Sequence, residues 1–199
     1  MTKKINHIKR KYRIVEAAFH VIYHSGFEKT TLRKIAQKAG LSLGSVQYFF
    51  PKQKDIYLFA MDVIYKRFEE RMRNVEQPKQ GAFEYAVRMV KQIVQVGTEE
   101  ERIENDIWVK FSLMATMNSD YQIRKNEFRE VNIKFAKEIL EMLKENNYIE
   151  RHTNIEESAI SLTIFVHGLV FESVMFTHFY NDRVVEKEVR KYLQQICCR

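Results

Sequence analysis

The sequence predicts an all-α fold of about nine helices, and three observations support this prediction. Apolar residues recur at three- and four-residue spacing along almost the whole chain of 199 residues. No stretch alternates apolar and polar residues for long enough to predict a strand. Only 6 Gly and 2 Pro interrupt the pattern, and the shares of hydrophobic (45%) and charged (30%) residues are those of an ordered globular protein.

Three helices are predicted in the first fifty residues. The first spans about residues 8–25 and ends where Gly26 can adopt the left-handed conformation. Thr31 can cap a second helix, which Gly40 can close. Ser42 can cap a third, short helix. The first two must each bury one face, and we expect Val46 and Phe50 of the third to join that core rather than contact a ligand.

A long helix is predicted from Lys54 to about Val75, and Pro78 and Gly81 then break the chain. It would connect a compact N-terminal module to a helical body. The body helices are predicted near residues 82–97, 101–118, 120–146, 154–180 and 183–197. Three of them carry capping-box signals, which are Thr98 with Glu101, Ser119 with Gln122 and Thr153 with Glu156.

The net charge of +7 is unevenly distributed. Residues 1–50 contain ten Lys or Arg but only Glu16 and Glu28, giving +8, whereas residues 51–199 carry a net charge of −1. Such a distribution is typical of a polyanion-facing module attached to a nearly neutral body, although a solvated basic face has the same composition.

Several features predict a soluble, cytoplasmic protein. The N-terminus has no apolar segment behind its charges, and the longest uncharged stretch, residues 158–171, is shorter than a membrane span requires. Cys197 and Cys198 are adjacent and form no disulfide framework, so we expect them to be reduced bystanders.

Residues 39–41 join two short helices with the spacing of a helix-turn-helix, whose second helix enters the major groove of DNA. The motif continues in both directions at Gly26-Phe27, Thr30 to Ala36, Ala39 to Ser42, Gly44 to Val46 and Tyr48 to Pro51. Together these residues resemble the N-terminal domain of TetR-type transcriptional regulators. The detailed resemblance spans about residues 8–60, and the body shares the helix number and a segment at residues 167–169.

The resemblance implies a DNA-binding domain at residues 1–53 and a ligand-binding and dimerisation domain at residues 54–199. It also implies a sequence-specific regulator that binds a palindromic operator on double-stranded DNA as a homodimer. A repressor released by a small, largely apolar inducer is the form we expect. The DNA-contacting positions would be Thr31, Arg33, Ser42, Leu43, Gly44, Ser45, Gln47, Tyr48, Lys52 and Lys54.

Chemistry gives several of these positions a specific role. Gly44 permits close approach, and Gln47 is long enough for a bidentate contact to adenine. Thr31 opens a helix whose free backbone N–H groups suit a phosphate. The sequence departs from the family pattern twice, because Gln47 replaces a second tyrosine and Gln53 replaces a phosphate-binding lysine. Either Lys52 or Lys54 would have to take over the role of that lysine.

Two further sets of residues are predicted in the body. The predicted ligand lining is Trp108, Phe111, Met114, Met117, Phe171, Met175 and His178, since Met and aromatic side chains suit a bulky apolar ligand. Asp106, His167, Glu172 and His178 are candidate polar anchors. The predicted dimer interface is Phe165, Gly168, Leu169, Val185, Val189, Leu193 and Ile196. Plain core packing is the alternative for both sets; paired half-sites on DNA favour the dimer over it, whereas most residues of the ligand set fit core packing as well.

Two other classes of protein remain open. Residues 40–44 spell the G-x-S-x-G nucleophile elbow of serine hydrolases, with His152, His167 and His178 further along, but that elbow needs a strand before the serine, and residues 31–39 are helix-periodic. A non-specific architectural DNA-binding protein would also be basic. No phosphate-binding loop, dinucleotide fingerprint or metal motif occurs, so we expect no enzyme, cofactor or metal.

Overall fold

The computed structural model describes residues 2–76 and 81–197, and the side chains from Asn6 onward. Within these ranges the chain is all-α and contains no strand, as predicted. The elements are α1 (Thr2–Ser25), α2 (Leu32–Ala39), α3 (Leu43–Phe49), α4 (Gln53–Arg73), α5 (Ala82–Lys91), α6 (Glu99–Met117), the 3-10 turn η1 (Ser119–Tyr121), α7 (Gln122–Glu145), α8 (Ile155–Met175) and α9 (Asp182–Ile196). Pro78 and Cys198, which the sequence analysis singled out, lie outside the described residues.

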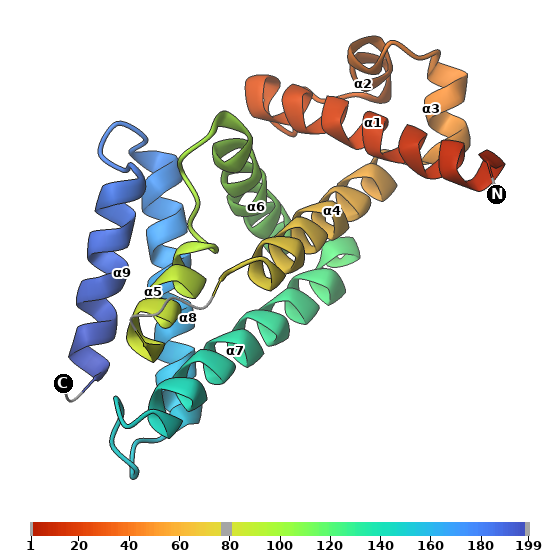
Figure 1. Ribbon diagram of the computed structural model, residues 1–199. Helices are drawn as coiled ribbons and strands as arrows, with labels where there is room; N and C mark the ends of the chain where they lie inside the picture. Colours follow the sequence, from red (N-terminus) through yellow and green to blue (C-terminus); the bar gives the residue numbers. More distant parts are fainter. Residues whose placement is uncertain (1, 77–80, 198–199) are drawn as a thin grey trace.

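The molecule consists of a head, α1–α3, and a body, α4–α9 (Figure 1). The head lies at one end, and α4 runs from it into the body. Helices α7 and α8 pack against each other, α6 packs against both, and α9 covers α5. Helix α6 also contacts α1, so that the head touches the body at two elements, α4 and α6.

Side-chain caps fix the helices of the head as the sequence predicts. The Thr31 hydroxyl accepts a hydrogen bond from the Lys34 backbone N–H at 3.2 Å, and the Ser42 hydroxyl accepts one from the Ser45 N–H at 3.1 Å. Gly40 closes α2 with φ at 62°. In this left-handed conformation, which L side chains disfavour, its N–H bonds the last carbonyls of the helix.

The capping predictions for the body are partly wrong. Thr98 and Glu101 form the predicted capping box of α6. At α8, however, Asn154 is the cap instead of Thr153, and its side chain accepts from two N–H groups of the first turn. Asn118 caps η1, and Ser119 lies inside that turn. In both places an Asn adjacent to the predicted residue supplies the capping oxygen, and Asn is at least as good an N-cap as Ser or Thr.

Three helix boundaries also differ from those predicted. Helix α1 begins at Thr2, well before residue 8. Helix α5 ends at Lys91 because the chain turns at residues 92–97. Helix α8 ends at Met175, where Phe176 leaves the helical conformation with φ at −127° and ψ at 55°.

The buried core does not divide at the predicted domain boundary. Val46 and Phe50 are buried in the head, as predicted. The cluster that contains them continues through Met61 of α4 and Phe111 of α6. A second cluster fills the space between α5, α7, α8 and α9. The boundary at residues 53 and 54 therefore coincides with the start of α4 but not with a gap in the packing.

Helix α8 is apolar on both of its sides. By length and composition alone it could cross a membrane. Its buried residues, Ala159, Leu162, Thr163, Val166, Leu169, Val170 and Ser173, pack in the core of the body. The core helix of a helical protein has the same apolar composition. Packing in the body explains the apolar residues on the buried side of α8, but not those on its exposed side.

Candidate DNA-binding surface and ligand cavity

The outer face of α3 presents small and polar side chains to solvent. Ser42, Gly44 and Gln47 are exposed there, and Tyr48 is 75% exposed. Gly44 has open space around it, because a Cβ atom added there would meet no atom within 4 Å. The backbone of α3 can therefore approach a partner surface closely.

Buried residues on the inner face of α3 fix its orientation. Val46 is fully buried, and the Phe50 ring lies 5.5 Å from the Phe59 ring of α4. The ring of Tyr48 lies edge-on to that of Phe49, with centroids 5.2 Å apart. His7 on α1 lies 4.7 Å from the Phe49 ring. The first turns of α1 thus lie beside α3, which the sequence analysis did not anticipate because it placed the start of the first helix later.

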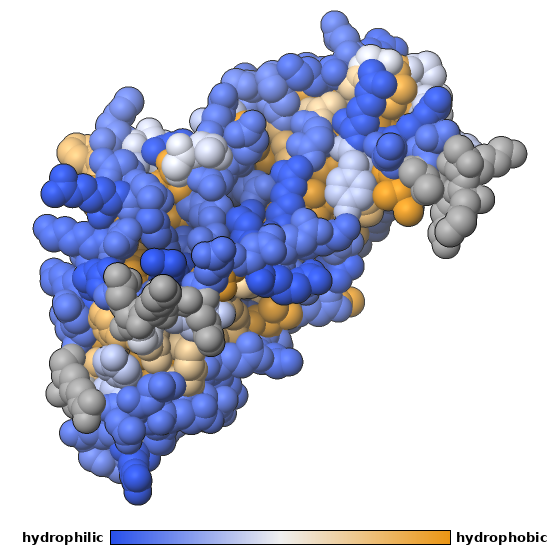
Figure 2. All heavy atoms as spheres, viewed as in Figure 1, coloured by the Kyte–Doolittle hydropathy of each residue, from blue (hydrophilic) through white to orange (hydrophobic). Residues whose placement is uncertain are grey.

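Positive charge surrounds this face. Arg33, Lys34 and Lys38 are exposed on α2, and Lys52 is exposed just before α4. Hydrophilic side chains cover most of the head in the view of Figure 2. A surface of this kind attracts a polyanion such as the phosphate backbone of DNA.

The three residues after Pro51 have distinct surroundings. Gln53 donates a hydrogen bond from Nε2 to the Thr30 carbonyl at 2.7 Å and also contacts the Tyr57 hydroxyl. It therefore holds the start of α4 against the turn before α2. Lys54 forms an ion pair with Asp120 at 2.8 Å, and that hydrogen bond raises the pKa of Lys54. Of the two lysines predicted to bind phosphate, Lys52 is thus the exposed one, and Lys54 contacts the body.

Ser42 lacks the context of a hydrolase nucleophile. The helix α2 precedes it where the nucleophile elbow requires a strand. Its hydroxyl caps α3. The G-x-S-x-G pattern is explained by capping.

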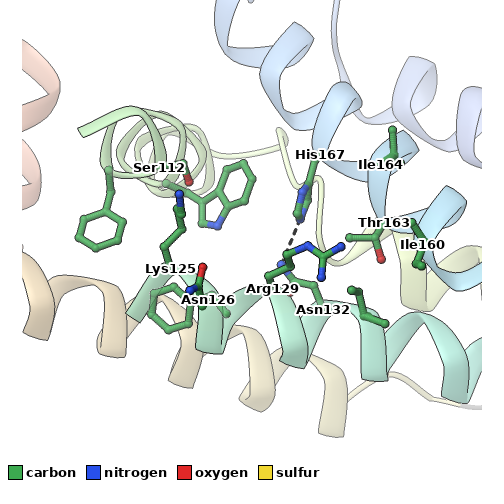
Figure 3. Close-up of a pocket in the computed structure, with 13 residues that line it drawn as sticks. Ser112, Lys125, Asn126, Arg129, Asn132, Ile160, Thr163, Ile164 and His167 are labelled. Atoms are coloured by element: carbon green, nitrogen blue, oxygen red, sulfur yellow. Dashed lines mark hydrogen bonds between the residues drawn. The ribbon is translucent and has the colours of Figure 1, made fainter. Parts of the chain in front are cut away.

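A cavity of about 270 Å³ opens between α6, α7 and α8 (Figure 3). Its lining consists of Trp108, Phe111, Ser112, Lys125, Asn126, Phe128, Arg129, Asn132, Ile133, Ile160, Thr163, Ile164 and His167. Trp108 and Phe111 belong to the predicted lining. The other five predicted residues lie outside this cavity.

Met114 packs against the core that the head shares with α4 and α6. Met117 (84%), Met175 (56%) and Phe171 (43%) are exposed, as is His178. None of these five lines the cavity. They do not line it because a helical face shared by aromatic and Met residues need not face inward.

The polar side of the cavity comes mainly from α7, which the sequence analysis missed. Lys125 and Arg129 extend from α7 across the cavity toward α6 and α8 in Figure 3. Asn132 Nδ2 lies 3.1 Å from His167 Nε2. Burial, with a smaller contribution from the charge of Arg129, lowers the pKa of His167, so its ring is neutral at neutral pH.

His167 is the one predicted polar anchor that lines this cavity. The Asp106 carboxylate pairs with Lys110 at 2.6 Å, and burial raises its pKa. Glu172 accepts a hydrogen bond from the Tyr180 hydroxyl at 3.4 Å. The described residues contain no group of three or more His, Cys, Asp or Glu that could hold a metal ion.

Residues 14–58 match the family model described as bacterial regulatory proteins, tetR family. The HTH-type transcriptional regulator PksA of Bacillus subtilis (strain 168) is 25% identical over 202 residues, which cover 99% of this chain and 94% of that protein. Residues 14–58 are therefore a helix-turn-helix domain of the TetR type, which explains the surface around α3. The similarity to PksA extends over the rest of the chain and supports a transcriptional regulator.

Solved structures share the whole fold. A transcriptional regulator from Rhodococcus sp. Rha1 superposes with a TM-score of 0.80 at 19% identity, covering 94% of this chain and 95% of that one. A putative transcriptional regulator from Saccharomonospora viridis, solved in complex with choline, has a TM-score of 0.81 at 19% identity and covers 96% of this chain and 99% of that one. The TetR fold thus extends over the body as well as the head.

Four of the seven predicted dimer-interface residues are buried within their own protomer. Val185, Val189 and Leu193 are fully buried inside the protomer. Leu169 is 7% exposed, and the Phe165 ring stacks on Tyr192 with centroids 4.1 Å apart. Ile196 packs partly against the same core. The apolar stripe of α9 faces its own body, and of the predicted set Gly168 alone lies fully exposed.

The apolar residues that α8 leaves exposed form a different set, which we call the α8 face: Ile160, Ile164, Phe171 and Met175, with Gly168 between them. Their spacing of three, four and seven residues puts them on one side of the helix. A Cβ atom added at Gly168 would meet nothing within 4 Å. This side was hidden in the sequence because α8 is apolar almost all round.

Proposed function

We propose that this chain is a TetR-family regulator, a cytoplasmic, homodimeric repressor that binds a palindromic operator and is released by a small molecule bound in the cavity between α6, α7 and α8. The observation that carries the proposal is the set of contacts joining α7, which lines the cavity, to α4, which begins directly after the DNA-binding head. The choline bound to the S. viridis neighbour supports a small-molecule site in a protein of this fold.

The contacts between α4 and α7 are both polar and aromatic. The Tyr65 hydroxyl on α4 donates to the Phe128 carbonyl at 2.8 Å and lies 3.1 Å from Asn132 Oδ1. The Tyr65 and Phe128 rings stack with centroids 3.9 Å apart. Phe128 and Asn132 also line the cavity. A ligand that displaces either side chain would therefore disturb a residue in direct contact with Tyr65 of α4.

Ion pairs extend this connection toward the head. Arg124 lies 3.3 Å from Asp62 of α4, and Lys54 in the first turn of α4 pairs with Asp120 before α7. Because Lys54 is also a predicted phosphate contact, movement of α7 would change both the direction of α4 and a cation at the DNA surface.

The α8 face supports the homodimer. A contiguous apolar surface rimmed by polar residues commonly marks a protein–protein interface. A single helix face pairs with itself across a two-fold axis, which gives the closed symmetry that two operator half-sites require. Gly168 would let the two α8 helices approach closely.

The release step follows from differential affinity. Two heads must fit successive major grooves about 34 Å apart. A ligand that binds better to a form with another head spacing shifts the population away from the operator-binding form. At saturating ligand, the free-energy difference between the two forms changes by the difference between their free energies of ligand binding.

Selection from a randomised duplex library with the purified protein tests the proposal, at about 150 mM salt so that phosphate attraction alone does not dominate. We expect an enriched inverted repeat, protected as two half-sites in a footprint. No enriched motif, with binding that vanishes as salt rises, would instead identify a non-specific architectural DNA-binding protein.

A further inference from the structure

The charge of the cavity limits which ligand it can take. Two cations, Lys125 and Arg129, line it, and its described lining contains no Asp or Glu. A cationic ligand would therefore meet like charge without any compensating carboxylate. A ligand carboxylate would meet a guanidinium and an ammonium on one side of the cavity, four residues apart on α7.

The carboxylate that pairs with Arg129 is weakly held. Arg129 Nη1 lies 3.7 Å from Glu130 Oε1, but the two side chains are 57% and 76% exposed. Exposed pairs of this kind contribute little, so the guanidinium can exchange Glu130 for a ligand carboxylate in the cavity at small cost.

His167 adds a neutral donor to the same site. With Asn132 donating through Nδ2, His167 Nε2 is the acceptor, and the ring proton then lies on Nδ1. The ring is held by Asn132 on one side and by Trp108 on the other, with the Trp108 and His167 centroids 4.8 Å apart. Neutral His and Asn side chains orient a carboxylate without adding net charge.

The remaining wall is apolar and the space is small. The wall is formed by Trp108, Phe111, Phe128 and Ile133, together with Ile160 and Ile164, which belong to the α8 face as well. A volume of about 270 Å³ lies just below the range for small-molecule sites, about 300 to 1,000 Å³. Aromatic walls at this size favour a compact, ring-sized apolar group over a long chain.

We propose that the cavity binds a compact organic anion, a carboxylate attached to an aromatic or branched apolar group, with Lys125 and Arg129 holding the carboxylate. This inference rests on the proposed ligand-responsive function and replaces the largely apolar inducer of the sequence analysis. It also separates this chain from its structural neighbour, since choline is a cation.

The chain supplies its own reporter of binding. Trp108 is its single tryptophan and lines the cavity, so its fluorescence reports occupancy directly. We would titrate the full-length protein with 3-phenylpropionate, 3-phenylpropanol and 3-phenylpropylamine, which share one apolar group and differ in charge, and with choline. Isothermal calorimetry on the same samples measures affinity independently of the fluorescence.

We expect the carboxylate to bind at least about tenfold more tightly than the alcohol, and the amine and choline to bind more weakly still. Lys125→Gln and Arg129→Gln should each lower carboxylate affinity by about fivefold to tenfold and leave alcohol affinity within about twofold. The matched control is Lys134→Gln on the same helix, whose side chain is 78% exposed and lies outside the cavity lining. It should bind all probes like the unaltered protein.

Three results would overturn the proposal: equal or tighter binding of the amine or choline, a carboxylate preference that survives in the Lys125→Gln, Arg129→Gln double variant, or no saturable carboxylate binding by calorimetry. Library selection on the same preparation keeps the two proposals apart. If an inverted repeat is recovered but no anion binds, only the proposed ligand class is wrong. If no sequence is enriched, the proposal of a sequence-specific regulator is wrong, whatever the cavity binds.

Discussion

The α3 and α8 helices both leave one face exposed, but the two faces differ in chemistry. The α3 face carries Ser42, Gly44 and Gln47, and exposed Lys and Arg side chains of α2, together with Lys52, lie on the same head. The α8 face carries Ile164 and other large apolar side chains around Gly168. Water satisfies the polar face of α3 at little cost, whereas exposed apolar area on α8 is unfavourable until another apolar surface covers it.

This difference shows what a helix face indicates about its partner. The small, polar face of α3 suits a hydrated, highly charged partner whose groups it can bond one by one. The α8 face offers area without hydrogen-bonding groups, so it suits a second apolar surface. Substitutions on the α8 face should therefore change the oligomeric state, whereas substitutions on the α3 face should change DNA binding without changing the oligomeric state.

The largest effect is expected at the α8 face. Phe171→Glu puts a carboxylate in a position that, in the proposed dimer, is buried against the partner, and an unpaired buried charge costs several kcal/mol. We expect a monomer in light scattering after size exclusion and a loss of operator affinity of about a hundredfold or more, because the two half-sites are no longer bound together.

The control for this variant is Ile123→Glu. Ile123 belongs to α7, not to the α8 face, and is 75% exposed, against 43% for Phe171. The Ile123→Glu variant should remain dimeric. A dimer that survives Phe171→Glu unchanged would show that the protein associates through another surface.

The next effect separates base reading from phosphate binding on the head. Gln47→Ala should cost about 1–3 kcal/mol on the preferred base and little on others, because it removes a base-edge contact. Lys52→Ala should weaken binding to every sequence and reduce the slope of log affinity against log salt by about one. Binding to a panel of single-base operator variants measures this difference. If Gln47→Ala lowers affinity equally for all of them, Gln47 does not read a base.

Two glycines of the head provide a matched pair. Gly40→Ala should destabilise the protein by about 1–2 kcal/mol, since φ of 62° is left-handed and the new Cβ would come 2.9 Å from the flexible end of Arg13. Gly44→Ala has open space and should stabilise α3 by up to about 1 kcal/mol, yet weaken operator binding by blocking close approach. Urea unfolding and operator titration of both variants measure these effects, and comparable stability losses would contradict the distinction.

The smallest effect concerns the contact between head and body. Asp120→Asn should release Lys54 and raise affinity for all DNA by a few fold, with a steeper salt dependence, because the freed ammonium can reach phosphate. The companion variant Lys54→Gln should lower that affinity by a similar factor. If Asp120→Asn has no effect when Lys54 is already Gln but raises affinity otherwise, the pair acts as a unit. Additive effects would mean that Asp120 influences DNA binding by another route.

Features that depend on residues close together along the chain could be predicted from the sequence. Thr31, Gly40 and Ser42 could be placed in advance because a cap forms with backbone only a few residues away. The buried positions of Val46 and Phe50 also followed from spacing within short helices. The body caps at Asn118 and Asn154 were missed by one residue because adjacent Asn and Ser or Thr compete for the same role.

The candidate cavity could not be predicted in the same way. Lys125, Arg129 and Asn132 recur at spacings of four and three residues, which does place them on one face of a helix. A solvated polar face has the same spacing, and only the position of α6 and α8 above α7 makes this one a cavity wall. Trp108 and Phe111 were found because their face of α6 does point inward.

The sequence by itself determined the helices, their caps in the head, the basic charge of the first fifty residues and the TetR-type motif, all of which depend on neighbours along the chain. The tertiary structure alone decided which apolar faces are buried. It turned the stripe of α9 into the core of its own protomer, left the α8 face exposed, paired Lys54 with Asp120 and placed two α7 cations along the wall of a cavity. Those outcomes depend on which helices meet, and periodicity within one helix specifies a face without specifying the element that covers it.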